Sequence, residues 1–162
     1  MQKNFRITNI SETAVRLEHS PSGKFPENAP LNTDFKPYRG KSKLRVEVIS
    51  GKVKVFSPPC VWHPGKIDDK NLGGTRLDLF WWHRNKKIPI LPGAISRNGW
   101  WAYENKCRFY WNIRKRWVEK WDAQGYSDWY FSGYGERNFK QALKDYILTF
   151  GKIPRVPAWI FG

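Results

Sequence analysis

Cysteine is nearly absent from this sequence, which holds only Cys60 and Cys107 in 162 residues. Two thiols are too few for a disulfide scaffold, and their scarcity is typical of a protein in a reducing compartment. Long apolar runs are also missing. Residues 1–6 lack the apolar stretch of a signal peptide, and no segment approaches the ~20 apolar residues of a membrane span. We therefore expect a soluble, cytoplasmic protein that is not secreted.

Acidic residues are scarce beside basic ones, with 14 Asp and Glu against 29 Lys and Arg and a net charge of +15. The excess is shared between the two halves of the chain, so no basic tail accounts for it. Such a field attracts polyanions and speeds their encounter. Nucleic acid is the leading candidate, because its phosphates supply affinity to any dense array of Lys and Arg. An acidic protein surface or an anionic membrane is the alternative that charge alone leaves open.

Motifs of catalysis are missing too. The sequence has neither a phosphate-cradling glycine-rich loop nor the serine elbow of hydrolases. Zinc could use the ligands Cys60, His63, His83 and Cys107, of which only the first two have usable spacing. A nuclease would need clustered carboxylates and a base, for which the candidates are Asp68, Asp69, Asp78 and Glu104 with His63 or His83. Nothing in the spacing gathers either set, which favours a protein without metal, cofactor or catalytic residues.

Aromatic residues are abundant, with 10 Trp, 7 Tyr and 10 Phe. Many must lie in the core, because one aromatic side chain buries a large area. Those that remain exposed between basic residues would form a stacking surface for unpaired bases. The aromatic content therefore favours a folded binding module over a generic polycation.

Residues 1–93 alternate apolar and polar side chains in short runs between Pro and Gly, which predicts at least five strands. One hairpin is expected between Asn4–Ile10 and Ala14–Glu18. A second is expected across Lys43–Phe56, with Ser50-Gly51 as its turn. The pattern predicts a small barrel or sandwich. Cations on the second hairpin and after the predicted strand Thr75–Trp82 are expected either to contact phosphate or simply to be solvated: Arg45, Lys52, Lys54, Arg84 and Lys86.

Residues 94–151 are predicted to form a second module after a boundary at Pro92–Gly93. Its expected elements are three strands and a helix: Trp100–Glu104, a central strand from Arg108 toward Glu119, Asp128–Phe131 and Glu136–Phe150. The apolar residues of the helix recur at helical spacing and predict its buried face: Phe139, Ala142, Leu143, Tyr146, Ile147 and Phe150. Residues 152–162 are expected to form an aromatic tail on the core. The whole chain is thus predicted to be α+β and mostly antiparallel β.

The central strand has two contrasting faces. Successive side chains of a strand point to opposite sides of the sheet, so Phe109, Trp111 and Ile113 are expected to face the core. The opposite face would carry groups that grip phosphates, stack on bases and read base edges: Arg108, Tyr110, Asn112, Arg114 and Arg116. A solvated strand face on a basic protein is the alternative interpretation.

The predicted βββα order of residues 97–151, with the run Trp129-Tyr-Phe-Ser-Gly-Tyr-Gly before an amphipathic helix, resembles the AP2 DNA-binding domain. In that family a three-stranded sheet backed by one helix lies in the major groove and contacts it through Arg and Trp. The resemblance implies that the polar face of the central strand meets nucleic acid, together with Trp129. The connection between the second and third strands is longer here, and the helix lacks the Ala-rich pattern of the family.

These observations predict a non-enzymatic nucleic-acid-binding protein, with DNA or RNA as partner and no membrane partner. A small interaction protein that docks onto a protein or ribonucleoprotein complex is the first alternative, because exposed Trp, Tyr and Arg are also hot-spot residues of protein interfaces. A small metal-dependent nuclease is the second.

Overall fold

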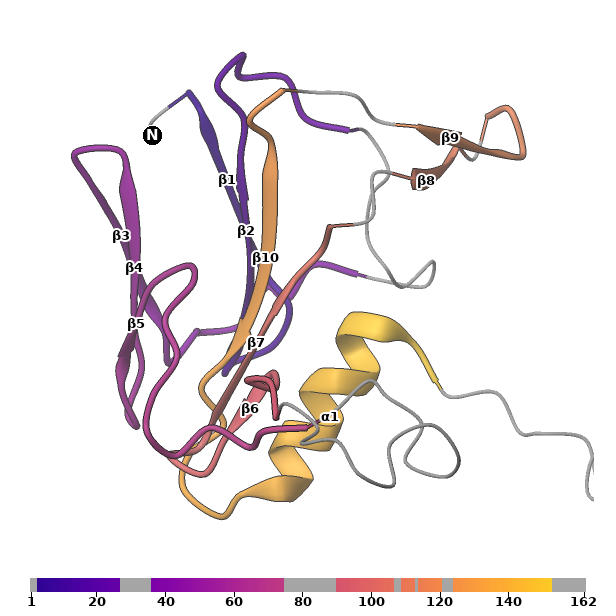
Figure 1. Ribbon diagram of the computed structural model, residues 1–162. Helices are drawn as coiled ribbons and strands as arrows, with labels where there is room; N and C mark the ends of the chain where they lie inside the picture. The colour runs from indigo at the N-terminus through magenta and orange to yellow at the C-terminus, as the bar shows by residue number, and fades with distance from the viewer. Residues whose placement is uncertain are drawn as a thin grey trace, which may run out of the picture.

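The structure is a computed structural model that describes residues 3–26, 36–74, 90–106, 109–112, 114–120 and 124–152 (Figure 1). Within these residues the chain is mostly antiparallel β-structure with one helix, which confirms the predicted α+β class. The strands are β1 (Phe5–Asn9), β2 (Ala14–His19), β3 (Arg45–Ile49), β4 (Lys52–Phe56), β5 (Val61–Trp62), β6 (Ile95–Ser96), β7 (Trp100–Glu104), β8 (Phe109–Asn112), β9 (Trp117–Lys120) and β10 (Ser127–Ser132), and the helix is α1 (Phe139–Phe150). The predicted strand Thr75–Trp82 and the tail beyond residue 152 lie outside the described residues.

The strands form two sheets and a separate hairpin. Five strands pair in the order β1-β2-β10-β7-β6, three pair in the order β3-β4-β5, and β8 pairs with β9. Neither sheet closes on itself, so the barrel expected for residues 1–93 is not confirmed. Strands from both sides of Pro92–Gly93 share the five-stranded sheet, since β1 and β2 precede this point and β6, β7 and β10 follow it.

Both hairpins predicted near the N-terminus are present. β1 pairs with β2 in a register that sets Ile7 opposite Leu17. β3 pairs with β4 around Ser50 and Gly51, whose φ angles are 50° and 74°. Positive φ at both central residues is the geometry of a two-residue hairpin turn whose twist matches the flanking strands.

The two sheets pack face to face through an apolar core. Val15 and Phe131 of the five-stranded sheet meet Val55 and Trp62 of the three-stranded sheet, and all four side chains are fully buried. The rings of Trp62 and Phe131 are stacked, with centroids 4.9 Å apart. Alternation explains the arrangement, because every second residue of β2, β4 and β10 points into this layer.

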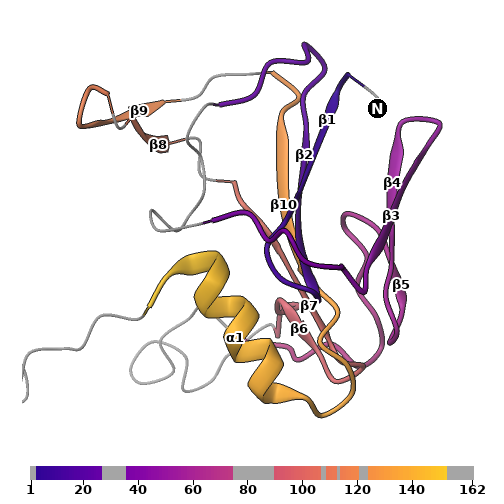
Figure 2. The same cartoon turned by 180° about the vertical axis from the view of Figure 1, so that it is seen from behind.

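Helix α1 covers the opposite face of the five-stranded sheet, so the sheet has a layer on each side (Figures 1 and 2). It contacts the sheet through Ala142, Phe150 and the buried carboxylate of Asp145. The helix begins after Asn138, whose side chain accepts a hydrogen bond from the backbone N–H of Gln141, and it ends at Gly151. Its first residue, Phe139, is three residues later than predicted. No helix in the described residues is long and apolar enough to cross a membrane.

The predicted buried face of α1 is wrong in part. Phe139, Leu143 and Tyr146 are exposed, and the exposed fraction of Phe139 reaches 64%. The helix is instead turned toward the sheet by Asp145, which accepts hydrogen bonds from several hydroxyl groups at 2.5–2.8 Å: those of Ser11, Thr13 and Ser132. Buried polar groups must find partners, and this requirement outweighs the apolar pattern.

The predicted central strand is also wrong in part. The chain forms the four-residue strand β8, turns at Arg114–Arg116 and returns as β9, which pairs with β8 alone. The three strands expected in the second module therefore do not form one sheet. Phe109 does not face a core, since 61% of its surface is exposed. Asn112 accounts for the turn, because its side-chain oxygen accepts the backbone N–H groups of Arg114 and Lys115 at 3.0 and 3.1 Å.

Candidate functional site

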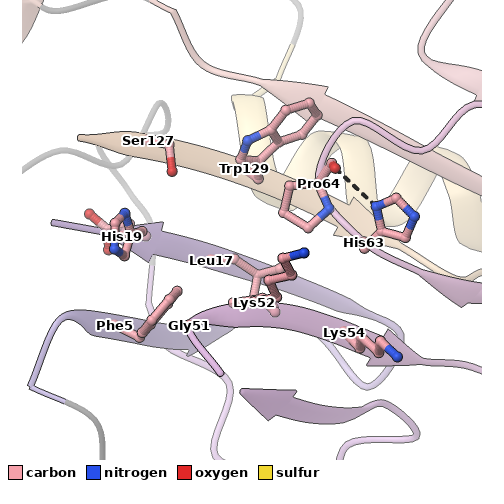
Figure 3. A pocket seen from close by; sticks show the side chains of 12 residues that line it. Phe5, Leu17, His19, Gly51, Lys52, Lys54, His63, Pro64, Ser127 and Trp129 are labelled. Atoms are coloured by element: carbon pink, nitrogen blue, oxygen red, sulfur yellow. Dashed lines mark hydrogen bonds between the residues drawn. The ribbon is translucent and has the colours of Figure 1, made fainter. Parts of the chain in front are cut away.

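A cleft of about 670 Å³ opens between the two sheets at the end where the tip of the β3–β4 hairpin stands away from β1, β2 and β10 (Figures 1 and 3). Its lining from the five-stranded sheet includes Phe5, His19 and Trp129. Its lining from the opposite side includes Lys52, Lys54, His63 and Pro64. Aromatic rings therefore form one wall of the cleft. The other, cationic wall is β4, where Lys52 and Lys54 are exposed and alternate with the inward-facing Val53 and Val55.

The aromatic wall follows from strand register. Phe5 and His19 are directly paired across β1 and β2, and their rings lie 4.7 Å apart. On β10, Phe131 points into the core, and Trp129, two residues earlier, points the same way but lies at the mouth of the core. The Trp129 ring is half-buried and packs at 5.6 Å from Trp62, which holds its orientation. The wall is thus built on rigid strands rather than on loops.

The cationic wall lies where β4 loses a neighbour. β5 pairs with β4 only at Val55 and Phe56, so within the described residues no strand lies along the edge of β4 beside Lys52 and Lys54. Both lysines are exposed, and neither forms an ion pair within the described residues. His63 follows β5, and its Nδ1 lies 3.1 Å from the carbonyl oxygen of Pro64. A donating Nδ1–H would leave Nε2 as a free acceptor.

A buried ion network lies behind the aromatic wall. Glu18 is fully buried, and both of its oxygens accept from Arg6 at 2.6 Å. Arg16 donates twice to Asp128, at 2.8 and 2.9 Å, and lies 3.1 Å from Glu18. Tyr126 donates its hydroxyl to Glu18 at 2.7 Å. These contacts tie β1, β2 and β10 together and so fix the strands that carry the cleft residues.

Burial shifts the protonation of this network. It raises the pKa of Tyr126, and the negative charges of Asp128 and Glu18 raise it further. It also raises the pKa of Asp128, although Arg16 and Asn105 hydrogen-bond its carboxylate and oppose the rise. Burial alone would lower the pKa of Arg16, but the hydrogen bond and charge of Asp128 raise it overall. The tyrosine therefore stays a neutral donor and the arginine stays charged.

Several of the acidic side chains are buried, so the charge of the remaining residues is more positive than the net charge of the whole chain. Glu18, Asp128 and Asp145 are withdrawn from solvent, and Arg16 is the one cation buried with them in the described residues. These four groups carry a net charge of −2, so the remainder of the chain carries +17.

The structure brings together three of the residues predicted to bind nucleic acid: Lys52, Lys54 and Trp129 line the same cleft. Arg45 lies apart on β3, where it covers the Phe56 ring at 4.4 Å and pairs with Glu47. Arg114 and Arg116 are exposed in the β8–β9 turn. Asn112 is occupied by the turn itself and by Glu119, so its predicted role as a base reader is not supported. Arg84, Lys86, Arg108 and the side chain of Tyr110 lie outside the described residues.

Sequence reasoning missed Phe5, His19 and Pro64, and it considered His63 only as a metal ligand or base. The pairing of Phe5 with His19 was accessible, because the predicted turn at residues 11–13 sets the β1–β2 register. The contribution of His63 and Pro64 was not, because it depends on how one sheet lies over the other.

The proposed metal ligands are not brought together in the described residues, where no group of three or more His, Cys, Asp or Glu could hold an ion. Cys60 is a half-buried thiol beside Ser57, and burial raises its pKa. His83 and Cys107 lie outside the described residues.

The nuclease carboxylates are occupied separately. Asp68 accepts hydrogen bonds from Ser96, Asn98 and Trp100, and these lower its pKa although burial alone would raise it. Asp69 lies near Lys70 and Glu104 near Lys106, while Asp78 lies outside the described residues.

Comparison with known proteins adds no relative to this picture. No protein-family model matches the chain, and a search of curated proteins found no match.

Proposed function

We propose that this protein binds nucleic acid without catalysis and holds an unpaired stretch of strand in the cleft between its two sheets. The observation that carries the proposal is the cleft itself, which is lined by the rings of Trp129, Phe5 and His19 and bordered by the exposed Lys52 and Lys54 of β4. Unpaired bases stack on aromatic faces whatever their sequence, and lysines meet the phosphates that join them.

The size of the cleft fits this ligand. Pockets of roughly 300–1,000 Å³ enclose small-molecule ligands, so about 670 Å³ suits one or two nucleotides and excludes a duplex. Base stacking on an aromatic side chain contributes about 1–3 kcal/mol per base. The net charge of +15 would attract the strand from a distance.

The test is a fluorescence titration with single-stranded DNA and RNA across a salt series. We expect binding at physiological salt with quenching of tryptophan emission, because bases stack on Trp129. Trp129→Phe keeps an aromatic face but removes this indole, so it should bind and show less quenching. Affinity falls with salt, and the steepness of this fall reports the number of phosphate contacts. Lys52→Gln/Lys54→Gln should make the plot of log affinity against log salt shallower by about 1.4, because each phosphate contact contributes about 0.7.

Lys140→Gln/Lys144→Gln is the matched control, since it removes the same charge from exposed positions on α1, on the other side of the five-stranded sheet. Equal loss in both double variants would mean that binding is a property of net charge and not of the cleft. Absence of any binding at physiological salt would overturn the proposed function.

A second candidate function, docking onto a protein partner, is favoured by one observation. α1 presents Phe139, Leu143 and Tyr146 to solvent on one flank, and such exposed apolar side chains mark interaction surfaces. The same titration separates the two functions, because a docking protein would bind naked nucleic acid weakly and without quenching.

A further inference from the structure

The β8–β9 hairpin stands apart from both sheets, at the end of the molecule where the tip of the β3–β4 hairpin lies, but on the side of the five-stranded sheet that α1 covers (Figures 1 and 2). In the part of the chain that the structure describes, β8 and β9 pair only with each other. A two-stranded ribbon alone has little core of its own, and an element of this kind usually acts through what it contacts. The function proposed for the cleft does not involve the side chains of this hairpin.

The tip of the hairpin is cationic and aromatic. Arg114 and Arg116 are exposed and form no ion pair in the described part of the chain. Trp117 follows directly, with 71% of its surface exposed. Lys115 is held differently, since it donates to Glu119 at 2.6 Å. Two unpaired guanidiniums beside an exposed indole are complementary to phosphates and base edges, and they repel another copy of this basic chain.

We propose that this hairpin contacts a DNA duplex beside the unpaired strand held in the cleft, so that the preferred ligand is a junction between single- and double-stranded DNA. This inference rests on the proposed function. The major groove of B-form DNA is about 12 Å wide and admits a two-stranded β-ribbon, whereas the major groove of an RNA duplex is too narrow. Arg114 and Arg116 contact the duplex, and Trp117 packs against its exposed base or sugar edges.

Chain length limits the distance between the two contacts. β9 ends at Lys120 and the cleft residue Ser127 begins β10, seven residues later. An extended chain covers at most about 3.4 Å per residue, so the base of the hairpin lies within about 24 Å of Ser127, and Arg116, eleven residues before Ser127, lies within about 37 Å of it. At about 3.4 Å per base step the larger distance corresponds to about eleven nucleotides. One short junction can therefore engage both sites at once.

The test compares three DNA probes: a single strand, a blunt duplex, and a duplex of about 12 base pairs with an overhang of about 11 nucleotides. We expect the wild-type protein to bind the junction most tightly. Arg114→Gln/Arg116→Gln should weaken junction binding at least about tenfold and reduce its salt slope by about 1.8, while single-strand binding changes less than about threefold. Gln keeps a polar side chain without the charge, although it is shorter than Arg, and circular dichroism verifies that the variant is folded.

Lys140→Gln/Lys144→Gln again controls for net charge and should leave the preference for the junction intact. Equal loss on the single strand and the junction, or no loss on either, would overturn the inference. An equal effect on an RNA duplex junction would overturn entry of the ribbon into a B-form groove. If single strands bind through the cleft but the junction has no advantage, the inference fails alone; if no probe binds at physiological salt, the proposed function fails with it.

Discussion

At the scale of single residues, Asp145 shows how one buried carboxylate can orient a helix. It is fully buried without a cation, and its charge is met by the hydroxyls of Ser11, Thr13 and Ser132 and the amide of Gln141. No apolar pattern in α1 predicts this arrangement, because the hydroxyl donors come from the turn between β1 and β2 and from β10 rather than from the helix.

Asp145→Ala should destabilise the protein by about 2–4 kcal/mol, because it leaves several buried donors without an acceptor. Urea unfolding followed by circular dichroism measures the loss. Asp69→Ala, at an exposed position, is the control and should cost less than about 0.5 kcal/mol. A loss for Asp145→Ala no larger than the control's would show that the hydroxyls find other partners.

Asp68 should make stability depend on acid pH. Its folded-state pKa is lowered by hydrogen bonds from Ser96, Asn98 and Trp100, so it contributes stability above the unfolded pKa of about 3.9 that is lost as pH falls through the folded value. Asp68→Asn should cost about 1 kcal/mol at pH 7, and the gap to wild type should narrow below about pH 4. Thermal unfolding at pH 7 and pH 3 tests this, and a gap that is constant with pH would contradict it.

At the scale of elements, the alternation of β1–β4 was readable from sequence, and both hairpins are present as predicted. The strand from Arg108 was not readable in full. Its run of aromatics and arginines alternates well beyond β8, yet Asn112 turns the chain by accepting two backbone N–H groups. A short polar side chain that competes for local backbone donors can interrupt a pattern that otherwise favours a longer strand.

Asn112→Ala should loosen the β8–β9 hairpin without unfolding the protein. The turn loses two hydrogen bonds, and among the described residues no third strand pairs with the hairpin. Hydrogen exchange should therefore speed up in residues 109–120, while β2 and β10 keep their protection. The internal control is α1, whose exchange should not change. Faster exchange throughout the molecule would mean that the hairpin supports the core after all.

At the scale of the whole molecule, the pattern of apolar and polar residues predicted the α+β fold class and the composition indicated the net charge. Neither predicted which residues share the cleft. Lys52, Lys54 and Trp129 were each candidates, yet nothing local states that they share a cleft. Their meeting depends on the packing of two sheets through Trp62 and Phe131, which is a long-range contact. The resemblance to the AP2 domain was drawn from strand order and from the run Trp129–Gly135 before the helix, whereas in the structure β10 pairs with β2, which lies outside that segment, as well as with β7.

The open edge of β4 has a consequence for solubility. Beside Lys52 and Lys54 this strand has no neighbour on one side in the described residues, so its backbone is open to another extended chain. Charged side chains are a common guard against such edge-to-edge aggregation. The two lysines are therefore placed to guard this edge as well as to line the cleft, and we expect apolar residues at these positions to make the edge a site of aggregation.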